Sequence, residues 1–157
     1  MTFEKILLAI DNSENAVRAA KKGLELQKKF DSTVVAFHSI AHGMIPKTIP
    51  VTVPTFPGGY PIPSVDYNKI QDAYIEAGEV ILQEINDMFQ EEEQEVETRL
   101  IVDEEPEDYI EKIVEEEDFD LVVLGCQGKH SKLEELLLGT VANKTVNHVN
   151  CDVLIVR

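Results

Sequence analysis

Residues 6–13 read ILLAIDNS, an apolar run that stops at three polar residues. The apolar part shows no alternation of apolar and polar side chains, which is typical of a strand buried on both faces of a parallel sheet. The polar residues are of types that cap helices. Apolar residues then recur at helical spacing: Val17, Ala20 and Leu24. The stretch therefore predicts a buried strand, a tight turn and a helix.

The same alternation continues to the end of the chain. Further apolar or β-branched runs predict strands at residues 33–40, 97–102, 121–124 and 153–156. A long helix is predicted between the second and third strands, with an inward face made of Ile70, Ala73, Tyr74, Ala77, Ile81, Ile85 and Met88. Pro106 suits the first turn of a helix whose inward residues are Ile110, Ile113 and Val114. A last helix is lined by Val141, Ala142, Thr145, Val146 and Val149. Strands that alternate with helices predict a doubly wound α/β fold with a five-stranded parallel sheet.

Composition narrows the function classes. A chain of 157 residues fits one domain, 1–157. Its net charge of -16 argues against nucleic-acid binding, which needs a basic surface. The amino terminus shows no signal pattern and no apolar run reaches membrane-spanning length, so we expect a cytoplasmic protein without membrane contact. Cys126 and Cys151 are too few and too far apart for a disulfide framework or a metal site, and we expect reduced thiols.

One segment breaks the pattern. Residues 42–65 hold six of the seven prolines and a Gly-Gly pair, which excludes a regular helix or a central strand. We therefore interpret residues 42–65 as a proline-rich insertion within the domain.

The carboxyl ends of the strands are where ligands gather in such sheets. After the fourth strand come Gly125 and Gly128, and Gly139-Thr140 directly precedes a helix. Glycines can take positive φ and let main-chain amides approach an anion, and a helix start offers unpaired amides. Lys129 and its neighbours add positive charge in an acidic chain, which suits a phosphate group. The plainer alternative is that the glycines only end a strand and cap a helix.

Taken in order, these motifs resemble the universal stress protein family. The shared features are Ile10-Asp11-Asn12-Ser13 after the first strand, His38-Ser39 at the end of the second, Asp120 to Gly128, Gly139-Thr140, and a closing cysteine followed by VLIV. The resemblance covers nearly everything except residues 42–65. It implies the adenine nucleotide alpha hydrolase-like architecture with strand order 3-2-1-4-5. With that order the last strand, in the stretch CDVLIVR, is an apolar edge of the sheet, and we expect a homodimer that covers it by joining two such strands.

The nucleotide-binding branch of that family implies a site for ATP, AMP or ADP. By matching position, Asp11 contacts the ribose, the main chain at Ser39 meets the adenine edge, and Ala9 and Leu124 flank the base. The phosphates are held by Gly125, Gly128, Gly139, Thr140 and the amide of Val141. Charge alone adds Lys129 to the phosphate site. Magnesium would enter through the nucleotide phosphates.

Several alternatives remain open at this point. The family pattern has nine residues between its second and third glycines, whereas residues 129–138 number ten. The extra residue either bulges harmlessly or shifts Gly139 away from the phosphates. A second interpretation is therefore a dimeric interaction module that binds no nucleotide and docks an unknown protein partner through its proline-rich segment.

We expect at most slow ATP hydrolysis, because no recognisable catalytic motif is present. The His-x-Gly-His signature of adenylyl transferases is absent, and a flavin carrier lacks a phosphate loop after the first strand. We interpret His38 as a hydrogen-bonded structural residue.

Overall fold

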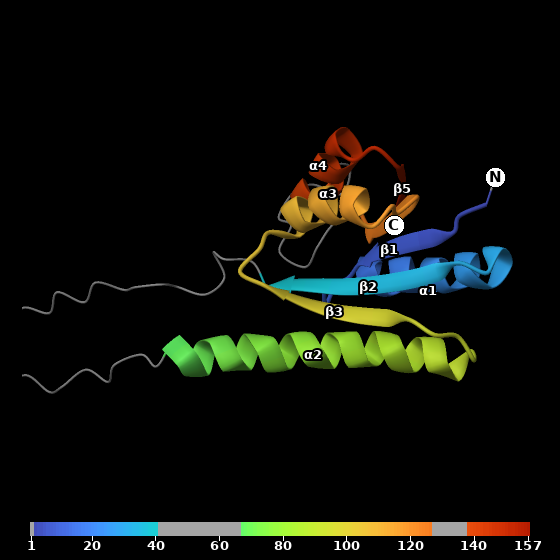
Figure 1. The fold of residues 1–157 in the computed structure, drawn as a ribbon. Helices are drawn as coiled ribbons and strands as arrows, with labels where there is room; N and C mark the ends of the chain where they lie inside the picture. Colours follow the sequence, from blue (N-terminus) through green and yellow to red (C-terminus); the bar gives the residue numbers. More distant parts are fainter. Residues whose placement is uncertain (1, 41–66, 127–137) are drawn as a thin grey trace, which may run out of the picture.

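A computed structural model describes residues 2–40, 67–126 and 138–157. In these ranges the elements are β1 (Lys5–Ala9), α1 (Glu14–Phe30), β2 (Thr33–Ile40), α2 (Tyr67–Glu91), β3 (Glu97–Val102), α3 (Pro106–Glu116), β4 (Leu121–Gly125), α4 (Thr140–His148) and β5 (Asp152–Val156). The strands form one sheet of order β3-β2-β1-β4-β5 (Figure 1), and every pair of neighbours is parallel. The predicted fold and strand order are confirmed.

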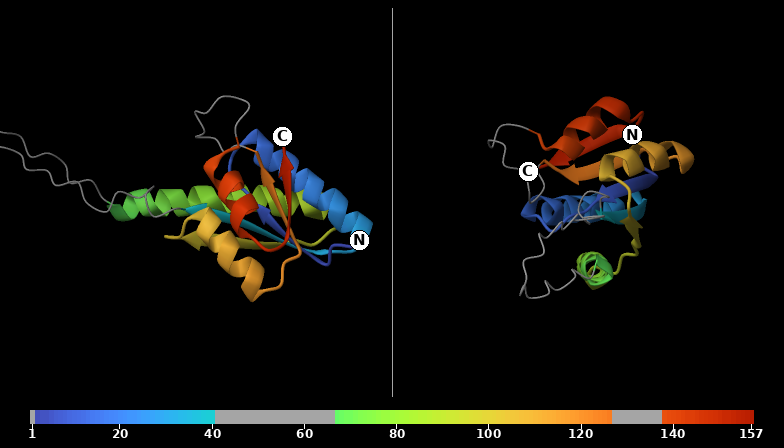
Figure 2. Two further views of the ribbon diagram at one scale, coloured as in Figure 1. Left: turned by 90° about the horizontal axis from the view of Figure 1, so that it is seen from above. Right: turned by 90° about the vertical axis from the view of Figure 1, so that its left-hand side faces the viewer.

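The sheet is covered on both faces (Figure 2). Helices α1 and α2 lie on one face, and α3 and α4 lie on the other. Successive side chains of a strand point to opposite faces. Ile6 and Leu8 accordingly pack into the cluster under α1 and α2, while Leu7 packs into the cluster under α3 and α4. An apolar run without alternation is the sequence that such a strand requires, because both of its faces are buried.

Helix α1 begins and ends as its sequence suggests. The Oγ of Ser13 accepts a hydrogen bond from the amide of Ala16 at 3.1 Å, and Asp31 closes the helix with a φ of 58°. The buried line of the helix consists of Ala16, Ala19, Ala20, Gly23, Leu24 and Gln27. Val17, one of the three apolar residues noted at helical spacing, is exposed, whereas Ala20 and Leu24 are buried. The small residues of the buried line let α1 lie closer to the sheet than a valine would allow.

Helix α2 buries part of the predicted face: Ile85 is buried, and Ile81 and Met88 pack against the core, as expected. The residues that face the sheet are Gly78, Leu82, Ile85 and Phe89. Tyr74, with 41% of its surface exposed, and its predicted companions Ala73 and Ala77 face solvent. The reason is Gly78, where an added Cβ would lie 2.6 Å from the Cδ1 of Leu100. The helix therefore lies directly against the sheet at Gly78, a residue that a count of apolar side chains overlooks.

Helix α3 begins at Pro106, and Ile110, Ile113 and Val114 are buried as predicted. Helix α4 buries Ala142 and Thr145, while Val146 is exposed, contrary to the prediction.

Within the described ranges, no helix combines the length and the apolar character that crossing a membrane requires. Both cysteines are free thiols.

An ion-pair network joins the sheet to the end of α3. Arg99 contacts Glu117 with Nη1 to Oε1 at 2.6 Å and Glu97 with Nε to Oε1 at 2.6 Å. The Nζ of Lys5 lies 2.9 Å from the other carboxylate oxygen of Glu117. Hydrogen bonds from Arg99, and secondly from Lys5, lower the pKa of Glu117 to about 2. The hydrogen bond with Glu117 is also the main cause that raises the pKa of Arg99. These charges stabilise the fold at the amino ends of the strands, away from the edge where a ligand is expected.

Candidate functional site

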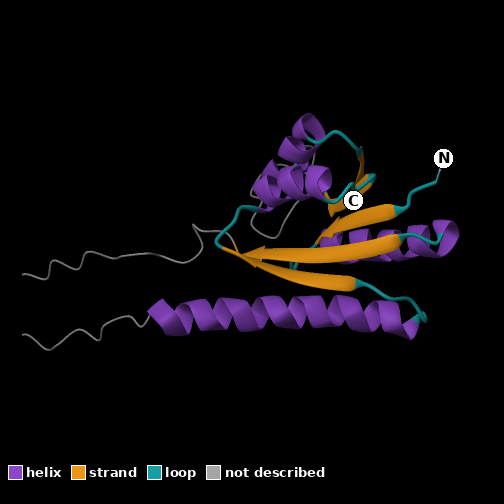
Figure 3. Cartoon of the chain, viewed as in Figure 1, coloured by secondary structure: helices purple, strands orange, loops and turns teal. Residues whose placement is uncertain are grey.

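The carboxyl ends of β1, β2 and β3 point the same way, as the arrowheads in Figure 3 show. At this edge Ala9 of β1 is the register partner of Leu124 of β4, and Gly125 follows directly. The structure therefore brings three predicted site residues together. Leu124 is only 2% exposed and belongs to the core under α3 and α4.

The turn between β1 and α1 holds Asp11 in a defined place. The Oδ1 of Asp11 accepts a hydrogen bond from the amide of Ser13 at 2.9 Å. No other described residue donates to the Asp11 carboxylate, so its Oδ2 can accept from a ligand hydroxyl. Ser13 is the N-cap of α1, as predicted. Asp11 thus closes the turn with one oxygen and keeps the second for a partner.

Ser39 lies at the end of β2, where the chain diverges from β1. Its Oγ donates to the carbonyl of Glu104, which ties β2 to the turn before α3. The carbonyl of Phe37 points towards β1, because it accepts from the amide of Ile10 at 2.9 Å. Main-chain groups alternate in direction along a strand, so those of Ser39 point the same way as those of Phe37. The main-chain groups of Ser39 therefore lie beyond Ala9, the last residue of β1, and have no partner residue in that strand.

Gly125 is required by close packing. An added Cβ would lie 2.8 Å from the Cβ of Asn15 and 3.2 Å from the amide nitrogen of Ala16. The φ of Gly125 is not in the left-handed region, and that of Gly139 is −62°. These two glycines therefore do not use the positive φ that glycine makes accessible. The first turn of α1 lies directly against residue 125, so a residue with a side chain does not fit there without a shift of the helix.

The connection from β4 to α4 is fixed at both of its ends. The amide of Cys126 donates to the carbonyl of Val156 at 2.8 Å, and the amide of Gly139 donates to the carbonyl of Cys126 at 2.8 Å. Gly139 is the N-cap of α4 and, as a glycine, makes no side-chain cap hydrogen bond to the helix. The first amides of α4, including those of Thr140 and Val141, consequently have no partner within the helix. Gly128 and Lys129 lie outside the described residues.

The sequence profile of the universal stress protein family matches residues 2–157. The chain belongs to this family. A universal stress protein of Methanocaldococcus jannaschii is 28% identical over 99% of this chain and 82% of its own length. Another, from Synechocystis sp., is 30% identical over 100% of this chain and 99% of its own length.

Solved universal stress protein structures share the fold. UspA from Lactobacillus plantarum has a TM-score of 0.78 at 18% identity and covers 100% of this chain and 99% of its own. A universal stress protein from Archaeoglobus fulgidus, solved in complex with dAMP, has a TM-score of 0.63 at 21% identity, with all of both chains covered. A family member from Arabidopsis thaliana with AMP bound has a TM-score of 0.64 at 16% identity and covers 98% of this chain and 90% of its own. Some structural neighbours of the chain therefore bind adenine nucleotides.

Two universal stress protein motifs have structural roles here. The carboxylate of Asp120 accepts from the amide of Glu4 at 2.6 Å and from that of Lys5 at 3.3 Å, so it orders the start of β1. The Nδ1 of His38 lies 2.8 Å from the carbonyl oxygen of Ile10, which confirms a hydrogen-bonded histidine. The importance of Ile10 and Glu104, whose carbonyls accept hydrogen bonds from His38 and Ser39, was not predicted. Their side chains give no sequence signal for that role.

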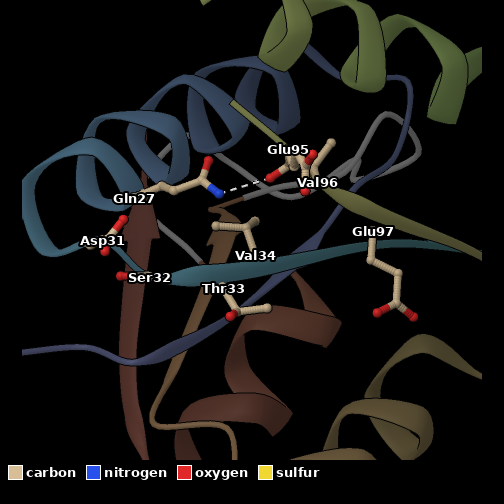
Figure 4. A pocket seen from close by; sticks show the side chains of 8 residues that line it. All are labelled: Gln27, Asp31, Ser32, Thr33, Val34, Glu95, Val96 and Glu97. Atoms are coloured by element: carbon tan, nitrogen blue, oxygen red, sulfur yellow. Dashed lines mark hydrogen bonds between the residues drawn. The ribbon is translucent and has the colours of Figure 1, made fainter. Parts of the chain in front are cut away.

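A separate hollow of about 460 Å³ lies at the other end of the strands, next to the amino ends of β2 and β3 (Figure 4). It is lined by Gln27, Asp31, Ser32, Thr33, Val34, Glu95, Val96 and Glu97. The Nε2 of Gln27 donates to the carbonyl of Glu95 at 2.8 Å. Among the described residues, no group of three or more histidine, cysteine or acidic side chains is arranged to hold a metal ion. The hollow contains none of the predicted site residues, and its lining has three acidic residues and no basic one, which disfavours an anion.

Proposed function

We propose that this universal stress protein binds an adenine nucleotide, ATP or its products ADP and AMP, at the carboxyl edge of its sheet. The observation that carries the proposal is the start of α4. Its cap is a glycine without a side chain, and its first amides have no helical partner. Such a helix start favours a phosphate group through its amides and its partial positive charge. The Thr140 hydroxyl, exposed at the first helical position, adds a donor.

The other site residues complete the fit. The Oδ2 of Asp11 is suited to accept from a ribose hydroxyl, and the main chain of Ser39 is suited to an adenine edge. Ala9 and Leu124 supply the apolar surface next to the base. The hydrogen bond between Gly139 and Cys126 supports the interpretation that the tenth residue of the loop leaves the register of α4 unchanged. Gly128 and Lys129 are proposed as further phosphate contacts, on the sequence argument alone.

The dAMP and AMP complexes of structural neighbours support an adenine nucleotide as the ligand class. Magnesium would enter with the phosphates of ATP, because the described residues form no metal cluster of their own. We further propose that the protein acts in the cytoplasm as a stress-response switch whose nucleotide state is sensed by a protein partner.

The proposal is tested by titration calorimetry with ATP and with AMP. Thr140→Glu places a negative charge at the start of α4, which favours the helix but repels a phosphate. We expect the variant to keep the stability of the wild type and to lose about tenfold in affinity, which corresponds to about 1.4 kcal/mol, because the new carboxylate would face a phosphate of like charge. Val146→Glu is the matched control, since Val146 is exposed on the same helix. Equal affinity of Thr140→Glu and the wild type would contradict a phosphate at this helix.

We also propose a homodimer through β5. Strand β5 pairs with β4 on one side only among the described residues, and it carries the apolar residues Val153, Leu154 and Ile155. Unpaired apolar edges are usually covered in native proteins. Sedimentation equilibrium at micromolar concentration should give twice the mass of one chain, and a monomer would count against the dimer. This dimer is also the basis of the alternative function, an interaction module that binds no nucleotide.

A further inference from the structure

His38 lies one residue before Ser39, on the face of the sheet that α1 and α2 cover. Its Nδ1 is 2.8 Å from the carbonyl oxygen of Ile10. A carbonyl oxygen only accepts hydrogen bonds, so Nδ1 carries the hydrogen and donates it. The amide of Ile10 in turn donates to the carbonyl of Phe37 at 2.9 Å. Both main-chain polar groups of Ile10, the residue directly before Asp11, are therefore held by β2.

Helix α2 confines the imidazole from the other side. A Cβ at Gly78 would lie 3.0 Å from the Cδ2 of His38 and 2.6 Å from the Cδ1 of Leu100. Leu100 is the register partner of His38, so both side chains project to the same face. The half-buried ring thus lies between α2 and the turn that follows β1, and both contacts restrict its movement away from Ile10.

We propose that His38 is a positioning residue for the nucleotide site, which it serves by fixing the direction of the Asp11 carboxylate. The carbonyl of Ile10 and the amide of Asp11 belong to one planar peptide unit. A hydrogen bond to that carbonyl fixes the orientation of the plane, and with it the start of the Asp11 residue. The Oδ1 of Asp11 is already tied to the amide of Ser13. With the plane and Oδ1 both held, Oδ2 has one direction in which to meet a ribose hydroxyl.

This inference rests on the proposed function, and it predicts a selective effect. A histidine that only packs would affect every nucleotide equally when it is replaced. A histidine that aims Asp11 affects ligands with ribose hydroxyls and spares those without them. AMP and 2′,3′-dideoxy-AMP separate the two cases, because they share the base and the phosphate.

The experiment compares the wild type with His38→Leu and His38→Asn by titration calorimetry with both ligands. Leucine removes the donor, whereas the asparagine amide keeps a donor near the place of Nδ1. We expect His38→Leu to weaken AMP binding about tenfold, the loss typical of a hydrogen bond to a charged group, and dideoxy-AMP binding less than about threefold. His38→Asn should bind AMP within about threefold of the wild type. If His38→Leu does not fold, Gly78→Ala takes its place, since its Cβ displaces the same ring.

Equal losses for the two ligands, or equal losses in the leucine and asparagine variants, would overturn the positioning role and leave the nucleotide site intact. Failure of the wild type to bind either ligand would overturn the proposed function and this role together. A separate readout needs no ligand: nitrogen-15 NMR of the histidines should show His38 with its hydrogen on Nδ1. A hydrogen found only on Nε2 in the neutral ring would refute the geometry itself.

Discussion

Replacing Gly125 with alanine tests how closely α1 lies against the end of β4. The new Cβ would be 2.8 Å from the Cβ of Asn15, 3.0 Å from the carbonyl carbon of Asn15 and 3.2 Å from the nitrogen of Ala16. Non-bonded carbon atoms rest about 3.5–4.0 Å apart, so the start of α1 has to move by roughly 0.7 Å. Two of the three atoms belong to the main chain and cannot rotate away. Overpacking of this kind costs about 1–3 kcal/mol of unfolding free energy.

The assay is urea unfolding followed by circular dichroism, together with the melting temperature. For a chain of this length, each kcal/mol lowers the melting temperature by roughly 2–4 °C. Gly23→Ala is the control, since its Cβ meets a side-chain methyl of Leu8 at 2.5 Å. Alanine within a helix also gains about 1 kcal/mol over glycine. Gly23→Ala should therefore cost less than Gly125→Ala. A Gly125→Ala protein as stable as the wild type would refute the packing argument.

Three further predictions concern stability and thiol chemistry. Because the pKa of Glu117 is lowered to about 2, its pairing with Arg99 stabilises the fold above pH 4.5 and is lost as the pH falls from about 4.5 to about 2. After allowance for solvent screening, Glu117→Gln should lower the free energy of unfolding by about 1 kcal/mol at pH 7, as measured by urea titration. The difference from the wild type should nearly vanish near pH 2, and a difference that stays constant with pH would contradict this. Asp120→Ala removes the acceptor for two amides at the start of β1 and should lower the free energy of unfolding by about 1–3 kcal/mol. An unchanged melting temperature would contradict this and would show that water replaces the carboxylate. Partial burial raises the pKa of Cys151 to about 11, so its alkylation by iodoacetamide at pH 8 should be at least about a hundredfold slower than that of free cysteine. A similar rate, measured by mass spectrometry, would contradict the raised pKa.

The fold follows from the sequence because its main signals are periodic. Strands buried on both faces, such as Ile6 to Leu8, need continuous apolar runs, and these are visible without a structure. The inward faces of the helices were harder to predict. The prediction for α2 counted large apolar residues, whereas the helix turns Gly78 towards the sheet. Close packing against a glycine leaves no hydrophobic signal.

The sequence was enough to choose the candidate site residues, but it did not reveal the main-chain contacts that orient them. The order of motifs along the chain pointed to Asp11, Ser39 and Gly139, and the structure places them after the ends of β1, at the end of β2 and at the start of α4. Their orientation depends on main-chain atoms of Ile10 and Cys126, and any residue type can provide those atoms. Only coordinates reveal such contacts.

The most direct test of the central claim is to map an adenine nucleotide onto the protein by amide NMR. A nitrogen-15 labelled sample is titrated with AMP, and the shifts of all assigned amides are followed. The account predicts saturable shifts at the carboxyl edge, above all at Ser39, Thr140 and Val141, with none at Val34 or Glu95 at the opposite edge. Shifts confined to the opposite edge, or no shifts up to millimolar AMP, would contradict it.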